Sequence, residues 1–164
     1  IERHTLSVLV DNEPGILARV VGLFSARGYN IESLTVSETE HGRRLSRITV
    51  VVTATPRTLV QIKLQLERLV PVHKVHDLTL EGAPLERELA LIKVAGSGEH
   101  RAETLRLADA FRAQIVDATV ESFVFEVTGK PGKIDSFIGL MQPLGLVEVV
   151  RTGLAAISRG QQGM

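Results

Sequence analysis

The pair Pro14-Gly15 marks a sharp change of pattern near the start of the chain. Before it, apolar residues alternate with more polar ones over residues 4–10, which predicts a strand with one buried face. After it, apolar residues recur at helical spacing: Leu17, Val20, Val21 and Phe24. Proline suits a helix start because its missing N–H is not needed there, and Gly28 is typical of a helix end. The pattern therefore predicts a strand, a tight turn and a helix.

The start of this helix offers a site for a small zwitterion. N–H groups at a helix start have no partner in the helix and lie at the positive end of its dipole, so they bind anions. We expect the free donors to be Gly15, Ile16 and Leu17, and Gly15 has no side chain to block a ligand. Asn12 and Asn30 each add a donor and an acceptor without net charge. On geometry alone, an ordinary strand-to-helix turn with Asn12 as a cap is the commoner explanation.

The alternation of strands and helices continues to about residue 80. Strands are predicted at 31–37, 47–55 and 72–80, with a polar turn at 40–44. A second helix is predicted between Pro56 and Pro71. The order βαββαβ packs its helices on one face of a sheet.

A second set of elements follows the turn-rich residues 81–84. Strands are predicted at 89–94, 115–120, 123–127 and 146–150, and helices at 101–112 and 133–142. The fold class is therefore α+β, with two ferredoxin-like βαββαβ modules. We place the domains at 1–80 and 84–158, and we expect the polar, glycine-containing residues 159–164 to form a flexible tail. A second pair, Pro131-Gly132, suggests that half-units were duplicated, although convergent packing explains it equally well.

Composition excludes several classes of function. The chain has 164 residues with 19 basic and 19 acidic side chains, and zero net charge argues against non-specific nucleic-acid binding. It has no cysteine, so disulfides and thiolate metal sites are excluded. No apolar run approaches the roughly 20 residues of a membrane span and no signal peptide is visible, so we expect a cytoplasmic protein.

No pattern in the chain predicts catalysis or metal binding. Gly96-Ser97-Gly98 lacks the further glycine of a dinucleotide site and the lysine of a P-loop. His73 and His76 are three apart on a predicted strand, so they face opposite sides and chelate poorly. No serine has an evident base, and no carboxylate pair has a convincing setting. We predict no catalytic residue, no metal ligand and no enzyme activity.

Residues 11–34 carry the sequence Asp-Asn-Glu-Pro-Gly-Ile-Leu and, after the helix, Gly-Tyr-Asn-Ile-Glu-Ser-Leu. This stretch resembles the ACT domain of the small, regulatory subunit of acetolactate synthase (acetohydroxyacid synthase). Further similar segments lie at 46–49, 86–94, 111–117 and 153–160, so the resemblance covers nearly the whole chain in order. The specific part is Asn-Ile-Glu-Ser-Leu, since a Pro-Gly turn alone is common to ACT domains.

The resemblance implies a non-catalytic subunit in branched-chain amino acid biosynthesis. Such a subunit binds the catalytic large subunit, raises its activity and imposes feedback inhibition by valine. The resemblance places thiamine diphosphate, Mg²⁺ and FAD in that partner and no cofactor in this chain. It makes 1–80 the ACT domain, for effector binding and dimerisation, and 84–158 a C-terminal regulatory domain.

By position, the resemblance also implies a valine site at an ACT dimer interface. The implied residues are Asn12, Gly15, Ile16, Leu17, Asn30 and Ile31. Family members often have another residue in place of Pro14, but its missing N–H leaves the three following donors intact. The βαββαβ order leaves strand 31–37 at an edge, and pairing with a second copy hides that edge. It also brings Asn30 of one chain near the turn of the other, so we expect a homodimer.

Two alternatives stay open at this stage. A free-standing amino-acid sensor acting on another enzyme shares the ACT turn, but it does not explain the similarity at 86–94 and 115–117. An amino-acid-responsive gene regulator needs a DNA-reading element, and the sequence has no helix-turn-helix or basic stretch. The sequence does not decide between valine, leucine and isoleucine as the effector.

Overall fold

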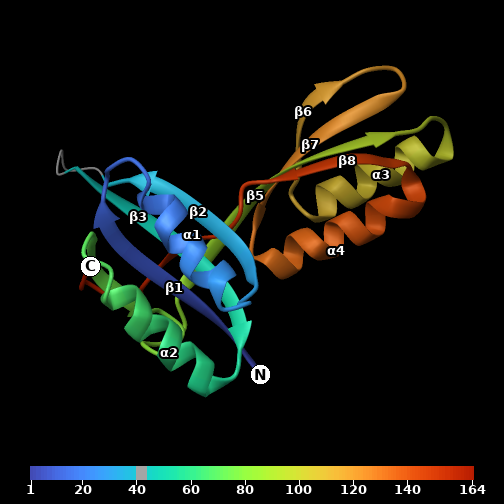
Figure 1. Ribbon diagram of the computed structural model, residues 1–164. Helices are drawn as coiled ribbons and strands as arrows, with labels where there is room; N and C mark the ends of the chain where they lie inside the picture. Colours follow the sequence, from blue (N-terminus) through green and yellow to red (C-terminus); the bar gives the residue numbers. More distant parts are fainter. Residues whose placement is uncertain (40–43) are drawn as a thin grey trace. The chain divides into compact units, whose positions relative to one another are not determined.

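The computed structural model describes residues 1–39 and 44–164 (Figure 1). Contacts divide the described chain into two compact units. The first unit comprises Ile1–Leu85 and Leu154–Met164, and the second comprises Glu86–Gly153. Each contains the order βαββαβ, which confirms the predicted fold class. The polar turn predicted at 40–44 lies, except for its last residue, outside the described residues.

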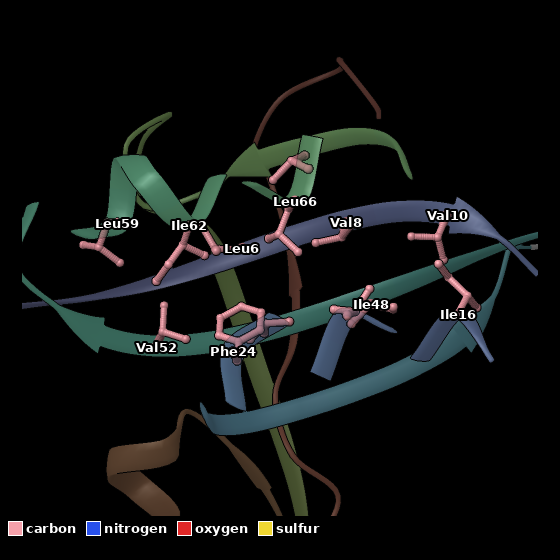
Figure 2. Packing of buried hydrophobic residues seen from close by; sticks show 13 residues of the cluster. Leu6, Val8, Val10, Ile16, Phe24, Ile48, Val52, Leu59, Ile62 and Leu66 are labelled. Atoms are coloured by element: carbon pink, nitrogen blue, oxygen red, sulfur yellow. The ribbon is translucent and has the colours of Figure 1, made fainter. Parts of the chain in front are cut away.

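The first unit is a four-stranded antiparallel sheet with two helices. Its elements are β1 (Glu2–Asp11), α1 (Ile16–Ala26), β2 (Ile31–Glu38), β3 (Leu45–Ala54), α2 (Pro56–Glu67) and β4 (Val72–Asp77). The strand order is β2-β3-β1-β4, so β2 is an edge strand, as predicted. Both helices pack on one face of the sheet, where Leu6 and Val8 of β1 meet Phe24 of α1 and Ile62 of α2 (Figure 2).

Strand β4 ends at Asp77, three residues earlier than predicted. The Asp77 carboxylate accepts a hydrogen bond from the Leu80 N–H at 3.2 Å, and the Glu81 N–H donates to the Asp77 carbonyl at 3.1 Å. Aspartate side chains favour turns in this way because they satisfy backbone groups locally. The apolar residues after Asp77 therefore belong to a turn and not to the strand.

The second unit repeats the topology of the first. Its elements are β5 (Leu85–Ala95), α3 (Glu99–Ala110), β6 (Gln114–Ala118), β7 (Ser122–Gly129), α4 (Pro131–Met141), a 3₁₀ turn η1 (Gln142–Leu144) and β8 (Leu146–Arg151). Its strand order is β6-β7-β5-β8. Phe125 and Phe137 meet edge to face in its core, with ring centroids 5.9 Å apart. Helices α3 and α4 each begin two residues earlier than predicted, at Glu99 and Pro131.

The last segment of the chain, Leu154–Met164, packs with the first unit and includes the short strand β9 (Ala155–Ile157). We call this segment the C-terminal strap. Only 1% of Leu154 is exposed, and the Leu154 N–H donates to the Ser33 hydroxyl of β2 at 3.0 Å. The second compact unit stops at Gly153, whereas the predicted domain runs from 84 to 158. The flexibility that the sequence predicts for residues 159–164 concerns motion, and it stays a prediction.

Candidate functional site

The turn between β1 and α1 is built around Gly15. This residue precedes the first helical residue and has a left-handed backbone, with φ 83° and ψ −5°. A residue with a Cβ adopts that conformation at a cost of about 1 kcal/mol or more, whereas glycine does not pay it. No atom lies within 4 Å of the position that a Cβ would take. Glycine is therefore favoured here by its backbone angles and not by lack of space.

The helix start presents three free donors. The N–H groups of Gly15, Leu17 and Ala18 donate to no backbone or side-chain acceptor within the described ranges. The Ile16 N–H, by contrast, donates to the Glu13 carbonyl at 3.4 Å. The predicted set therefore changes by one member, with Ala18 in place of Ile16. No acidic residue lies in the first turn of α1, so the positive end of the helix dipole has no charge partner there.

Two of the three apolar residues predicted at the site, Ile16 and Leu17, lie on different sides of the helix. Ile16 is 6% exposed and belongs to the hydrophobic core. Leu17 is 39% exposed, so it can contact a ligand. The structure thus leaves Leu17, and not Ile16, to form an apolar wall.

Asn12 does not cap the helix, because no side chain bonds to the helix start. Its Nδ2 donates to Glu38 Oε1 at 2.8 Å, and its backbone N–H donates to the Arg44 carbonyl at 2.7 Å. A carboxylate only accepts hydrogen bonds, which fixes the orientation of the amide. The Asn12 Oδ1 is then the acceptor that remains for a ligand. The capping explanation for Asn12 is therefore wrong.

Asn30 and Ile31 lie at the other end of α1, where β2 begins. Asn30 is exposed and Ile31 is half-buried. The eleven residues of α1 span about 16 Å at 1.5 Å per residue. One chain therefore does not bring Asn12 and Asn30 together around a small ligand. Strand β2, which begins directly after Asn30, is an edge strand.

Two histidines of β4, His73 and His76, each lie within hydrogen-bonding distance of a carboxylate. His73 Nε2 lies 2.6 Å from Asp11 Oδ1, and His76 Nδ1 lies 2.7 Å from Glu81 Oε1. In the described parts of the chain, no group of three or more histidine, cysteine, aspartate or glutamate side chains could hold a metal ion. No helix among those parts is long and apolar enough to cross a membrane.

His4 is the buried titratable group that sequence reasoning missed. Its Nδ1 lies 2.6 Å from Asp77 Oδ2 and its Nε2 lies 2.9 Å from Glu2 Oε2. Burial lowers the pKa of His4, but the hydrogen bonds and charges of Asp77 and Glu2 outweigh burial and raise the pKa above 6.5. The pair joins the start of β1 to the end of β4. The contact between His4 and Asp77 joins residues that are 73 positions apart, so no local sequence pattern indicates it.

Comparisons with known proteins agree with this architecture. A family model described as "AHAS small subunit-like ACT domain" matches residues 6–74, and one described as "Small subunit of acetolactate synthase" matches residues 87–160. The acetolactate synthase small subunit of Haemophilus influenzae is 47% identical over 163 residues, covering 99% of each chain. The acetolactate synthase isozyme 3 small subunit of Escherichia coli is 44% identical over 163 residues, again covering 99% of each.

A crystal structure of the acetolactate synthase small subunit from Thermotoga maritima superposes with a TM-score of 0.89. It is 39% identical, and the match covers 99% of this chain and 100% of that one. Fold and helix start together define a class, the proteins in which an ACT domain is followed by a second βαββαβ module. Within that class, the chain belongs to the family of acetolactate synthase small subunits. This finding favours the subunit over the free-standing sensor and the gene regulator.

Proposed function

We propose that this chain is the non-catalytic regulatory subunit of acetolactate synthase in branched-chain amino acid biosynthesis. It activates the catalytic large subunit and confers feedback inhibition by valine. The observation that carries the proposal is the open helix start at Gly15, with three free N–H donors on the ACT domain of a small subunit.

Valine fits the chemistry of this turn. Its carboxylate would accept from the N–H groups of Gly15, Leu17 and Ala18, at the positive end of α1. Its ammonium would donate to Asn12 Oδ1. This oxygen is left for the ligand because the Asn12 Nδ2 donates to Glu38, which turns Oδ1 away from the Glu38 carboxylate. Its isopropyl group would contact the exposed side of Leu17.

The site is completed by a second copy of the chain. Strand β2 is an edge strand, and pairing two such strands hides both edges. Asn30 of the second copy then supplies the amide that one chain places at the far end of α1. The active form is therefore a homodimer joined through its ACT domains.

Catalysis belongs to the partner. Thiamine diphosphate, Mg²⁺ and FAD are assigned to the large subunit, and no cofactor is assigned to this chain. The bonds of His4, His73 and His76 to carboxylates support structural roles for these histidines. The pathway places both subunits in the cytoplasm.

Reconstitution with the cognate large subunit tests the proposal. Acetolactate formation should be absent with this chain alone, should rise when it is added to the large subunit, and should fall again when valine is added. Calorimetric titration with valine, leucine and isoleucine identifies the effector. Unchanged kinetics on mixing two competent subunits would contradict the proposal.

A further inference from the structure

The two helices of the first unit form a groove that carries positive charge. Helices α1 and α2 lie side by side on one face of the sheet (Figure 1). Two open hollows of about 430 and 410 Å³ are lined by residues of both helices and their ends, and Arg27, Gln65 and Arg68 line both hollows. The hollows therefore form one continuous groove, which we call the helix groove.

The sequences of the helices place the lining residues in two rows. Arg19, Leu23 and Arg27 recur every four residues along α1 and its end, so they share one side of that helix. Gln61 and Gln65 have the same spacing on α2. Rows with this spacing are the ridges against which a further helix packs. The lining is completed by Tyr29, Leu64, Arg68 and Leu69.

The three arginines of the helix groove are exposed and have no acceptor in the chain. Within the described residues, the side chains of Arg19, Arg27 and Arg68 form no hydrogen bond or ion pair, and no acidic residue lines the groove. Arg47 and Arg151, by contrast, donate to acceptors in the chain. The formal charge of the whole chain is zero, so the groove is a local positive surface that attracts anionic groups.

A buried polar atom of the helix groove also lacks a partner. Gln65 lines both hollows, and among the described residues nothing bonds to its Oε1, which is buried. A buried acceptor that is left unpaired destabilises the fold. Rotation of the amide toward the groove would let a donor on a bound molecule satisfy this oxygen. Cations, an apolar surface and an unsatisfied acceptor are thus available to one occupant.

We propose that the helix groove docks an acidic amphipathic helix of the catalytic large subunit. Carboxylates of that helix would pair with the arginines, whose guanidinium groups bind a carboxylate through two parallel hydrogen bonds. Its apolar side would lie on Leu23, Leu64 and Leu69, as helices do in hydrophobic grooves. Leu64 is 50% exposed, so it has apolar surface to bury. This inference rests on the proposed function, since it takes the large subunit as the partner.

Two other occupants fit the helix groove less well. A second copy of the chain, docked by the same face, would bring arginines against arginines, and like charges facing each other across an interface repel. A nucleic acid would pair its phosphates with the cations, but phosphates do not bury the leucines between them. An acidic amphipathic helix satisfies both features of the groove.

The first test neutralises the cations of the groove in the full chain. The groove variant carries Arg19→Gln, Arg27→Gln and Arg68→Gln. The control variant neutralises three other exposed cations: Lys74 on the open face of the sheet, which the helices do not cover, Arg112 and Lys130.

Both variants are titrated into the purified cognate large subunit, and the concentration that gives half-maximal activation is measured. We expect this concentration to rise at least about tenfold for the groove variant and less than about twofold for the control. Added salt should weaken activation by wild type more than activation by the groove variant, because salt screens the charges that the variant lacks.

The second test changes the apolar part of the groove. Leu64→Asp places a carboxylate where it repels an acidic helix, and Leu140→Asp is the matched control at a leucine that is 42% exposed on α4. Half-maximal activation should need at least about fivefold more of the Leu64→Asp protein and less than about twofold more of the control. Valine affinity, measured by calorimetry, should stay within about twofold of wild type for Leu64→Asp, which shows that the fold and the effector turn are intact.

The outcomes separate docking from the proposed function. Activation by the groove variant and by Leu64→Asp at wild-type concentrations would overturn the docking role and leave the proposed function standing. Loss of the wild-type oligomer in the groove variant, seen by sedimentation, would assign the groove to a second copy. Binding of a short mixed-sequence DNA duplex that the groove variant loses would assign it to nucleic acid, and either result overturns the proposal. A wild-type chain that never activates the large subunit removes the proposed function, and docking with it.

Discussion

The two modules each place a Pro-Gly pair at a helix start, yet the two starts differ in their free N–H donors. In the first, Gly15 stands before the helix in a left-handed conformation. In the second, Pro131 is already the first residue of α4, and Gly132 lies inside the helix. The N–H groups of both Lys133 and Ile134 donate to the Lys130 carbonyl, at 3.0 and 3.3 Å. Beside the first pair the N–H groups of Gly15, Leu17 and Ala18 are free, whereas at the start of α4 Pro131 has no N–H and that of Lys133 is bonded.

The other helix start of the second unit, that of α3, differs from the start of α1 in its charge. Helix α3 follows a glycine with positive φ, Gly98, as α1 follows Gly15. Its first turn, however, carries Glu99, whose carboxylate already neutralises the helix dipole and repels an incoming anion. The comparison teaches that topology alone does not set the chemistry of a helix start. Among the described helix starts, only α1 combines a left-handed glycine, free donors and a first turn without an acidic residue.

The largest expected effect concerns what holds each unit together. Leu154→Ala removes a side chain that is 1% exposed, and the cost of such a change is about 2–5 kcal/mol. We expect the first unit to lose stability while the second unit, which ends at Gly153, keeps its own. Denaturant unfolding followed by hydrogen exchange resolves the two units. The control Leu105→Ala, at a residue 37% exposed on α3, should cost much less. An equal loss in both units would contradict the division.

The next effect tests the helix start directly. Gly15→Asp should weaken valine binding about 10- to 100-fold, since the new carboxylate occupies the free donors and repels that of the ligand. Because φ is positive, alanine is a strained control. Gly15→Asn is a better control than alanine, since asparagine has the shape of aspartate, tolerates the left-handed conformation and carries no charge. It should keep most of the affinity, and Gly132→Asp in α4 should change it little. Equal losses for Asp and Asn at position 15 would indicate a steric or backbone cause.

A smaller effect is expected from the side chain that orients Asn12. Glu38→Ala removes the acceptor of the Asn12 Nδ2, and one such hydrogen bond contributes about 0.5–1.5 kcal/mol. Valine affinity should fall about two- to tenfold. Glu38→Gln keeps an acceptor oxygen and should restore most of it. If both variants bind like wild type, Glu38 does not position Asn12.

The dependence of stability on pH should also differ between the units. The folded-state pKa of His4 is raised above 6.5, so its ion pairs stabilise the first unit fully below that pH. This contribution is lost as pH rises from about 6.5 through the folded-state pKa. Urea unfolding of wild type across this window should show the decline, and His4→Gln should flatten it. Identical slopes for the two proteins would rule out His4 as the source.

Much of the architecture follows from local pattern. Alternation in β1, helical spacing in α1 and the prolines on either side of α2 helped to predict the βαββαβ order of the first module and, from that order, the edge position of β2. The misses depend on contacts between distant residues. Strand β4 stops at Asp77 because its carboxylate meets His4 and a turn amide, and the strap has only a three-residue strand that no period can reveal.

The site was predicted less completely than the fold. Proline and glycine predict that a helix starts near residue 15, but not whether the glycine lies inside it. That choice replaces one free donor, Ile16, with Ala18, and it places the side chain of Ile16 in the core. The role of Glu38 depends on where β2 ends relative to Asn12, which no local pattern specifies. The predicted effector residues stay predictions until ligand binding is measured.

The strap also affects how the protein is made. Its bonds join residues that are 121 positions apart at Ser33 and 157 apart at Ser7. A ribosome adding about 5–20 residues per second takes roughly 4–15 s to pass from Asp77, the end of β4, to Leu154. During that interval the nascent ACT domain has its helices and strands but lacks the segment that lies across its open face. The N-terminal domain, although synthesised first, is therefore completed last.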